Sequence, residues 1–121
     1  MIRSRKIDKS KLALPAETKI RNEKHRRWIA SLPCLITRIE GNSQAAHIRS
    51  GNSAGMGLKS GDDCCVPLSI AEHARQGRDG EVVFWAWHGG VEKATKLAKD
   101  LYAVSGDTAE ALKLINAWRT A

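Results

Sequence analysis

The segment most informative about the architecture of this chain is AAHIRSGNSAGMGLKSGDDCCVPLSIAEHARQGRDGE, residues 45–81. It opens on apolar residues that lead to His47, and residues 49–63 then form a run rich in glycine and small polar side chains. Such a run predicts an irregular loop, whereas residues 64–68 are apolar enough for a short extended segment. A second histidine, His73, follows on the next element. The predicted order is therefore strand, loop, extended segment and helix.

The residues before and around His47 predict a β-hairpin. Residues 34–39 show a short apolar alternation, and residues 40–43 (Glu-Gly-Asn-Ser) have the composition of a turn. Residues 44–48 then have the pattern of a second strand. This hairpin would present His47 near its end.

The helix after the loop is predicted by its start and stop signals. Ser69 is a suitable N-cap, and Glu72 stands at the capping-box position three residues later. The helix should run over about 70–76 and stop at Gly77, because glycine favours helix ends. This helix would carry His73.

The other predicted elements are helices. An amphipathic pattern spans residues 16–31, and further helices are predicted over 81–87, over 91–106 and from Asp107 onward. The predicted fold class is α+β. Its core covers about residues 34–77, with a basic helix before it and two or three C-terminal helices packed over it.

The length and composition predict a single domain. The chain has 121 residues, of which 42% are apolar, and this is enough for one modest core. We expect the domain over residues 16–121, with its C-terminal helices over about 81–120. Residues 1–15 lack periodicity and are expected to form a basic flexible arm.

The expected compartment is the cytoplasm. No apolar run is long enough for a transmembrane span, and no secretory signal is recognisable. The cysteines, Cys34, Cys64 and Cys65, make an odd count. We therefore expect reduced thiols, some of them facing the core, and no disulfide framework.

The net charge of +7 is concentrated near the N-terminus. Residues 1–27 hold ten Lys or Arg against three Asp or Glu, whereas the rest of the chain holds ten of each sign. A basic arm on a neutral body is typical of proteins that bind phosphate backbones, because each neutralised phosphate releases counterions. A solubilising tail is the alternative that the same composition allows.

A series of spaced motifs extends over about residues 26–90. They are Ala46-His47-Ile48-Arg49, Gly55-Met56-Gly57-Leu58-Lys59-Ser60-Gly61-Asp62, Val66-Pro67-Leu68, Glu72-His73-Ala74-Arg75-Gln76, and Glu81 with Phe84-Trp85. Together they resemble a phage and prophage family of HNH-type (ββα-metal) nucleases, which includes the recombination-enhancement nuclease Ref and related phage proteins. The resemblance implies a ββα-metal core, in which a hairpin presents one histidine and a helix holds a divalent cation.

The resemblance also implies roles for the two histidines. His47 matches the general base that activates water, and His73 matches the first metal ligand on the helix. Gly77 stands where the family has a second ligand histidine, and glycine offers no donor. The cation would be Mg²⁺ or Mn²⁺, held by His73 with waters, substrate phosphate and nearby carboxylates. The candidate carboxylates are Asp62, Asp63, Asp79 and Glu81.

Many relatives carry a structural zinc site, and the matching positions are degenerate in this chain. They are Cys34, Thr37, Ser69 and Glu72. Because only the first keeps a thiolate donor, we expect no structural zinc. Hydrophobic packing should take its place, through Leu35, Ile39, Leu68 and Ile70.

The candidate nucleic-acid-binding residues are basic. Arg49 follows the hairpin histidine, Lys59 lies in the glycine-rich loop, and Arg26 and Arg27 lie on the outer face of the first helix. Solvated surface charge is an equally good interpretation of Arg49 and Lys59.

The remaining histidines and the tryptophans belong to no motif. We expect His25 on a helix surface and His88 at a helix end. The tryptophans could stack on bases, but core packing is the more frequent role of aromatic residues at helical spacing. They are Trp28, Trp85, Trp87 and Trp118.

The sequence thus predicts a DNA-binding endonuclease of the HNH type, connected with phage recombination, that hydrolyses phosphodiesters with His47 as general base. One alternative is a catalytically degenerate nucleic-acid-binding protein on the same fold. Another is a protein-interaction module whose basic arm meets an acidic partner. The expected partner is nucleic acid, DNA in the first place, with a recombination protein as a further partner and no membrane. The oligomeric state stays open.

Overall fold

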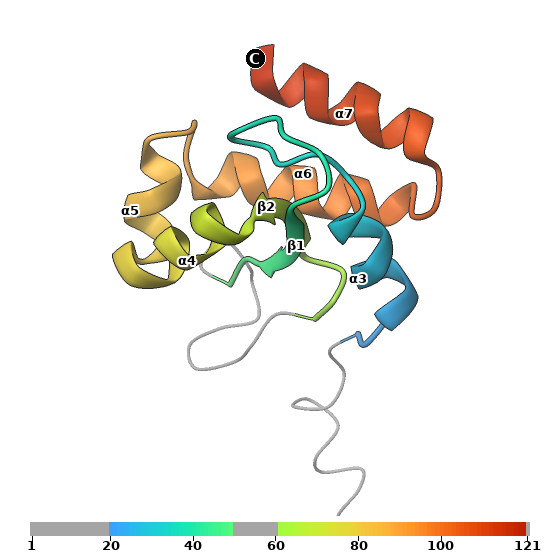
Figure 1. Cartoon of the computed structure of the whole chain (residues 1–121), viewed down its shortest axis with the longest axis horizontal. Helices are drawn as coiled ribbons and strands as arrows, with labels where there is room; N and C mark the ends of the chain where they lie inside the picture. Colours follow the sequence, from blue (N-terminus) through green and yellow to red (C-terminus); the bar gives the residue numbers. More distant parts are fainter. Residues whose placement is uncertain (1–19, 50–60, 121) are drawn as a thin grey trace, which may run out of the picture.

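The structure is a computed structural model that describes residues 20–49 and 61–120 (Figure 1). Strands β1 (Ser43–His47) and β2 (Cys65–Ser69) form a two-stranded antiparallel sheet. The helices are α3 (Glu23–Ala30), α4 (Ile70–Asp79), α5 (Glu81–Ala86), α6 (Val91–Ala103) and α7 (Thr108–Thr120). The class is α+β, as predicted, and β1, β2 and α4 follow one another in a small ββα arrangement. The predicted arm over residues 1–15 lies outside the described residues.

The partner of β1 differs from the one predicted. β1 pairs with β2, in a register that sets Ser43 opposite Ser69 and His47 opposite Cys65. Every residue of β2 is buried. Pairing with a strand that is apolar on both faces buries more surface than pairing with the preceding segment would, so a partner farther along the chain replaces the local one.

Residues 34–39 form turns, so the hairpin predicted between 34–39 and 44–48 is wrong. The N–H of Cys34 donates to the carbonyl of Ile39 at 3.1 Å, and the N–H of Arg38 donates to the carbonyl of Cys34 at 2.9 Å. Arg38 has a φ of 66°, in the left-handed region that interrupts a strand. The short alternation in this segment therefore reflects burial at a turn.

Helix α4 begins where predicted and ends later. The hydroxyl of Ser69 accepts the N–H of Glu72 at 3.2 Å, which confirms the N-cap. The helix continues through Gly77 to Asp79, because an interior glycine costs only about 1 kcal/mol and does not by itself break a helix. It stops at Gly80, whose φ of 89° favours glycine. The predicted end at Gly77 is therefore wrong.

The other helices match the predicted segments closely. α5, α6 and α7 lie in the segments predicted as helices, and Asp107 accepts the N–H of Glu110 at 3.2 Å. Helix α3 starts later than predicted, at Glu23 with Asn22 as its N-cap. Residues 20–22, which were predicted to be helical, are therefore not part of the helix.

The core lies around the sheet, α3 and α6. Helix α6 packs against β2, and α7 packs against α6 (Figure 1). The large buried apolar side chains include Ile29, Leu32, Leu35, Ile48, Leu68, Phe84, Trp85, Leu101 and Ile115. Burying each such side chain contributes about 1.5–3 kcal/mol. This packing holds the ends of β1 and β2, and with them the site, in place.

Several predicted burial states are wrong. Ile39 and Ile70 were expected in the core but are 58% and 56% exposed. Trp87 is 81% exposed, whereas His25, expected on a helix surface, is only 1% exposed. Ile39 lies on a turn and Ile70 on the outer face of the first turn of α4, so the core closes without them.

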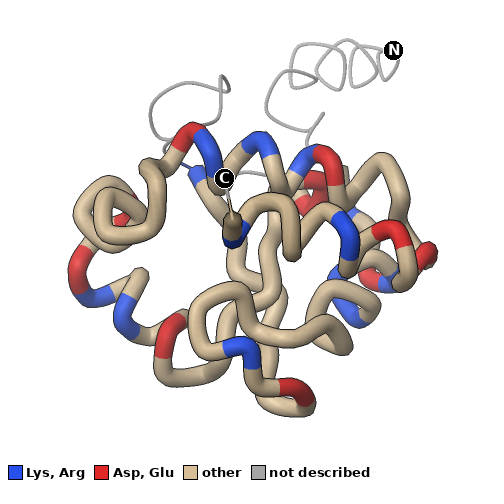
Figure 2. The backbone as a smooth tube through the Cα atoms, turned by 90° about the horizontal axis from the view of Figure 1, so that it is seen from above, with Lys and Arg blue, Asp and Glu red and all other residues tan. Residues whose placement is uncertain are grey.

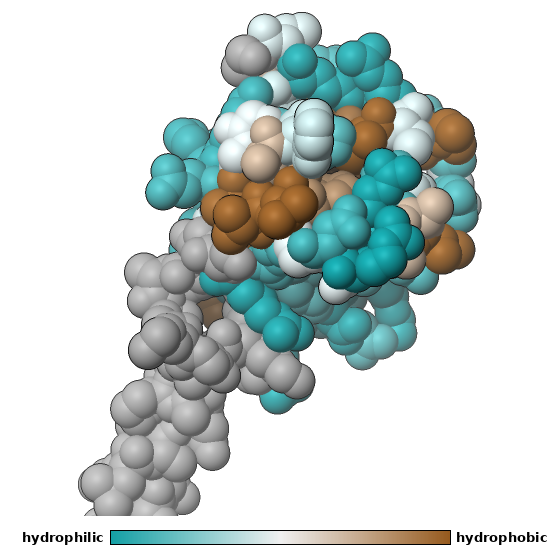
Figure 3. Space-filling view, turned by 90° about the vertical axis from the view of Figure 1, so that its left-hand side faces the viewer, coloured by the Kyte–Doolittle hydropathy of each residue, from teal (hydrophilic) through white to brown (hydrophobic). Residues whose placement is uncertain are grey.

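The surface of the described body mixes both charges. Figure 2 shows basic and acidic residues interspersed around the tube, in agreement with the neutral composition beyond the N-terminal region. Exposed apolar residues include Ile70 of α4 and Val82 and Val83 of α5. Figure 3 views the molecule from the left-hand side of Figure 1, where α4 and α5 lie, and shows apolar patches on a largely hydrophilic surface. Within residues 20–49 and 61–120, no helix has the length and apolar character needed to cross a membrane.

Candidate functional site

His47 and His73 border the same cavity. His47 is the last residue of β1, and His73 lies on α4, whose helix packs against β1. The cavity has a volume of about 470 Å³. It is lined by His47, Arg49, His73, Gln76, Gly77, Gly80 and Glu81. The ββα arrangement thus brings together the two histidines that sequence analysis singled out.

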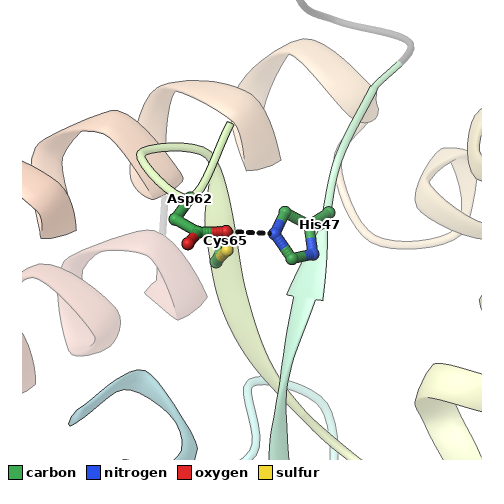
Figure 4. Close-up of side chains that lie close together, drawn as sticks. All are labelled: His47, Asp62 and Cys65. Atoms are coloured by element: carbon green, nitrogen blue, oxygen red, sulfur yellow. Dashed lines mark hydrogen bonds and ion pairs between the residues drawn. The ribbon is translucent and has the colours of Figure 1, made fainter. Parts of the chain in front are cut away.

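Asp62 fixes the orientation of His47. Nε2 of His47 lies 2.8 Å from Oδ1 of Asp62 (Figure 4). Burial disfavours ionisation of Asp62, but hydrogen bonds from His47 and from the N–H of Asn22 outweigh it and hold the pKa of this carboxyl below its usual value. An ionised carboxylate can only accept, so Nε2 of His47 carries a proton, and in the neutral ring Nδ1 is the nitrogen that keeps the lone pair.

The other oxygen of Asp62 is held by the start of α3. Oδ2 accepts the backbone N–H of Asn22 at 2.7 Å and the Nε–H of Arg26 at 3.1 Å. The two carboxylate oxygens of Asp62 therefore bind different partners: Oδ1 contacts His47, and Oδ2 accepts hydrogen bonds from the start of α3. Sequence analysis named Asp62 only among four candidate carboxylates, because nothing local connects it to His47.

Cys65 completes a cluster with His47 and Asp62. Its position opposite His47 in the sheet puts the two side chains on the same face. One ligand atom from each of the three residues lies within 4.8 Å of the other two, so the group could hold a metal ion (Figure 4). Burial raises the pKa of the Cys65 thiol to about 12. Sequence analysis treated this cysteine as a core thiol, because the pairing of β1 with β2 was not foreseen.

His73 is suited to bind a cation as a neutral ligand. Its Nδ1 lies 2.8 Å from the amide oxygen of Gln44, which can only accept, so Nε2 keeps the lone pair. Burial, followed by the nearness of His47, lowers the pKa of His73. One turn later, Gly77 lies at the same cavity and offers no donor.

The four candidate carboxylates are distributed unevenly. Glu81 lines the cavity, and its two carboxylate oxygens accept the backbone N–H of Arg49 at 2.8 and 3.0 Å. Asp62 bonds to His47 on the sheet side. Asp63 and Asp79 are not among the residues that line the cavity. A hard cation at the cavity would therefore depend on His73 and Glu81, with waters and substrate phosphate supplying the other ligands.

The four predicted nucleic-acid-binding residues have different surroundings. Arg49 lines the cavity. Arg26 forms an ion pair with Asp62, and Arg27 forms one with Glu23 one helical turn away. Lys59 lies outside the described residues. Arg26 thus supports the His47 site through its carboxylate partner.

The degenerate zinc positions have structural roles of their own. Sγ of Cys34 accepts the N–H of Thr37 at 3.4 Å and that of Ser69 at 3.2 Å. Burial opposes ionisation of Cys34, but hydrogen bonds from Thr37 and Ser69 lower its pKa. Ser69 also caps α4, and the buried carboxylate of Glu72 lies 3.6 Å from Arg75. Leu35 pairs its N–H with the carbonyl of β2's Pro67 at 3.0 Å, which joins this segment to the sheet.

No family model, curated protein or solved structure matches this chain significantly.

Proposed function

We propose that this protein is a metal-dependent endonuclease of the HNH type that hydrolyses DNA phosphodiesters. The observation that supports this most is the hydrogen-bonded pair of His47 and Asp62 beside a cavity that His73 also borders. A histidine oriented by a carboxylate is a suitable general base near neutral pH. The basic N-terminal region provides affinity for a phosphate backbone.

His47 would act on the attacking water. The water oxygen forms a bond to phosphorus, its proton passes to Nδ1 of His47, and the bond from phosphorus to the leaving sugar oxygen breaks. The leaving oxygen takes a proton from solvent. Asp62 holds the ring and stabilises the positive charge that develops on it, as carboxylate partners of catalytic histidines do.

A divalent cation would neutralise charge on the scissile phosphate. His73 and Glu81 are the residues at the cavity that would hold it, and Mg²⁺ or Mn²⁺ would keep several waters there. Arg49, at the same cavity, is placed to contact a phosphate oxygen.

The second candidate is a protein that binds nucleic acid without cutting it. Gly77 favours this alternative, because the helix then provides one histidine where two would hold a cation firmly. Both candidates share the same fold and the same basic region, so a cleavage assay distinguishes them.

The test is the nicking of supercoiled plasmid DNA in Mg²⁺ and in Mn²⁺. We expect His47→Gln to lower the rate about 10²- to 10⁴-fold, the usual contribution of a general base. The control is His88→Gln, because His88 packs on Phe84 and Trp85 and does not line the cavity. A salt-sensitive mobility shift without nicking would favour the binding protein, and equal loss of nicking in both variants would contradict His47 as the base.

A further inference from the structure

The cluster of His47, Asp62 and Cys65 has a donor set unlike that of a hard-cation site. It offers an imidazole nitrogen, a carboxylate oxygen and a thiol sulfur, all within 4.8 Å of one another. Mg²⁺ prefers oxygen ligands, whereas Zn²⁺ accepts all three donor types. The chemistry of the cluster therefore favours zinc over magnesium.

The backbone holds two of the three donors rigidly. His47 and Cys65 are cross-strand partners in the sheet, and the N–H of Ile48 donates to the carbonyl of Cys64 at 3.0 Å beside them. Cys65 is fully buried in β2. Its Sγ consequently has little freedom to move away from the imidazole.

The third donor, Oδ1 of Asp62, is oriented by hydrogen bonds to the other oxygen of the same carboxylate. Oδ2 of Asp62 is bound to the N–H of Asn22 and to Arg26, which leaves Oδ1 directed at His47 (Figure 4). Metal-binding carboxylates are commonly fixed in this way by outer hydrogen bonds. Zinc bond lengths of about 2.0–2.3 Å put neighbouring ligands of a tetrahedral ion roughly 3.3–3.7 Å apart. The three ligand atoms, which lie within 4.8 Å of one another, would have to approach by side-chain rotation to reach that spacing.

The site is open on the side of His47. The side chain of His47 is 34% exposed and that of Asp62 is 13% exposed. An ion can reach the cluster from this side, and a water can take the fourth ligand position.

We infer that His47, Asp62 and Cys65 form a zinc site, distinct from the hard-cation site at His73 and Glu81, and that zinc there switches the proposed nuclease off. Binding replaces the His47–Asp62 hydrogen bond by bonds to the ion: the Cys65 thiol releases its proton to solvent, and the imidazole proton of His47 moves from Nε2 to Nδ1. The proposed base and its positioning carboxylate are then both occupied. The inhibitory effect rests on the proposed function, whereas zinc binding does not.

The site is tested by titrating the full chain with Co²⁺, a spectroscopic substitute for Zn²⁺, in the presence of a phosphine reductant. Bonding to Cys65 should give a thiolate-to-cobalt charge-transfer band in the near ultraviolet, and added Zn²⁺ should remove it. Cys65→Ser should lose this band. The matched control is Cys64→Ser, because Cys64 is equally buried and adjacent but precedes β2 and is not a member of the cluster.

His47→Gln and Asp62→Asn provide a second measurement with Cys65 intact. Each should weaken cobalt binding at least tenfold, as loss of a ligand or of its support does, and circular dichroism checks that each variant is folded. A band that survives in Cys65→Ser, or that never forms in the wild type, would overturn the zinc site. If cobalt and zinc bind but zinc leaves nicking unchanged in excess Mg²⁺, the inhibitory switch is wrong and the site stands.

Discussion

His47 has one ring nitrogen already bound, because Nε2 donates to Asp62 across 2.8 Å. This contact joins the end of β1 to the residues that precede β2, and the backbone N–H of Asn22 ties the same carboxylate to α3. The sequence could show that a histidine and several carboxylates lie near one another in the chain. It could not show which carboxylate orients the ring, since fifteen positions and a glycine-rich loop separate His47 from Asp62.

The first prediction concerns Asp62. We expect Asp62→Asn to lower the nicking rate at least about tenfold, because a neutral amide no longer stabilises the positive charge on His47. Asp63→Asn removes the same charge one residue later, from a carboxylate that is not the one bonded to His47, and should keep wild-type nicking. Plasmid nicking at a fixed Mg²⁺ concentration measures both. Similar rates in the two variants would show that Asp62 has no positioning role.

The second prediction concerns His25 and the pH dependence of stability. Nδ1 of His25 lies 2.6 Å from the hydroxyl of Ser105, and within the described residues its buried Nε2 has no hydrogen-bond partner. Burial lowers the pKa of His25, against the opposing charges of Asp62 and Asp63. The unfolded chain therefore binds this proton more tightly than the folded protein does. As far as His25 is concerned, the free energy of unfolding is highest above the unfolded-state pKa near 6.5, and it decreases as the pH falls below that value.

Urea unfolding at pH 7.5, 6.5 and 5.5 tests this sign. His25→Gln should show a smaller loss of unfolding free energy over this range than the wild type, whatever its stability at pH 7.5. His73 and His88, whose pKa values are also lowered, contribute with the same sign in both proteins, so the comparison isolates His25. An unchanged slope in the variant would contradict the prediction.

Helix starts depend on signals within one segment, and these predict the structure correctly, whereas strand pairing depends on a distant partner that no local signal identifies. The capping box at Ser69 gave the start of α4, and Asp107 gave that of α7, because each cap bonds within one turn. The partner of β1 was missed, since strand pairing is decided by burial across the sheet. The end of α4 is not decided by glycine alone, because Gly77 stays within the helix and Gly80, three residues later, ends it.

The third prediction follows from the position of Gly77 in α4. Within the described residues, a Cβ added there would meet nothing within 4 Å, and the residue lies one helical turn after His73 at the same cavity. Gly77→His should therefore create an i, i+4 pair of histidines that holds a cation more firmly. We expect nicking to reach half its maximum at a lower Mn²⁺ concentration. The titration of activity with Mn²⁺ measures the shift.

Gly77→Ala is the matched control for this variant. It should raise the free energy of unfolding by about 0.5–1 kcal/mol, because alanine loses less backbone entropy than glycine in a helix, and leave the Mn²⁺ dependence unchanged. If both substitutions shift the Mn²⁺ dependence alike, helix stability rather than a new ligand is the cause.

Hydrogen bonds between segments far apart in the sequence connect the C-terminal helix to the rest of the domain. Arg119 of α7 donates to the carbonyls of Cys34 at 2.7 Å and of Leu35 at 3.3 Å. These hydrogen bonds connect the C-terminal helix to residues 34–35, the segment where the resemblance described above would imply a zinc knuckle. No local sequence pattern predicts a hydrogen bond between residues about eighty-five positions apart. The α+β class, in contrast, follows from the order of apolar segments along the sequence.

The last prediction follows from the uneven distribution of charge along the sequence. Removing residues 1–15 deletes five cations and one anion, Asp8, and leaves fifteen Lys or Arg against twelve Asp or Glu. Each phosphate contact contributes about 0.9 to the slope of log affinity against log salt, so the slope for duplex DNA should become shallower by up to about 4 to 5. Fluorescence anisotropy between 50 and 200 mM salt measures this slope.

The control is the double variant Lys96→Gln and Lys113→Gln. Both lysines form ion pairs with neighbouring acidic residues on the folded body, so their loss should change the slope little. A truncated chain that binds with the full slope would place the phosphate contacts on the folded body instead, with Arg49 the first residue to examine.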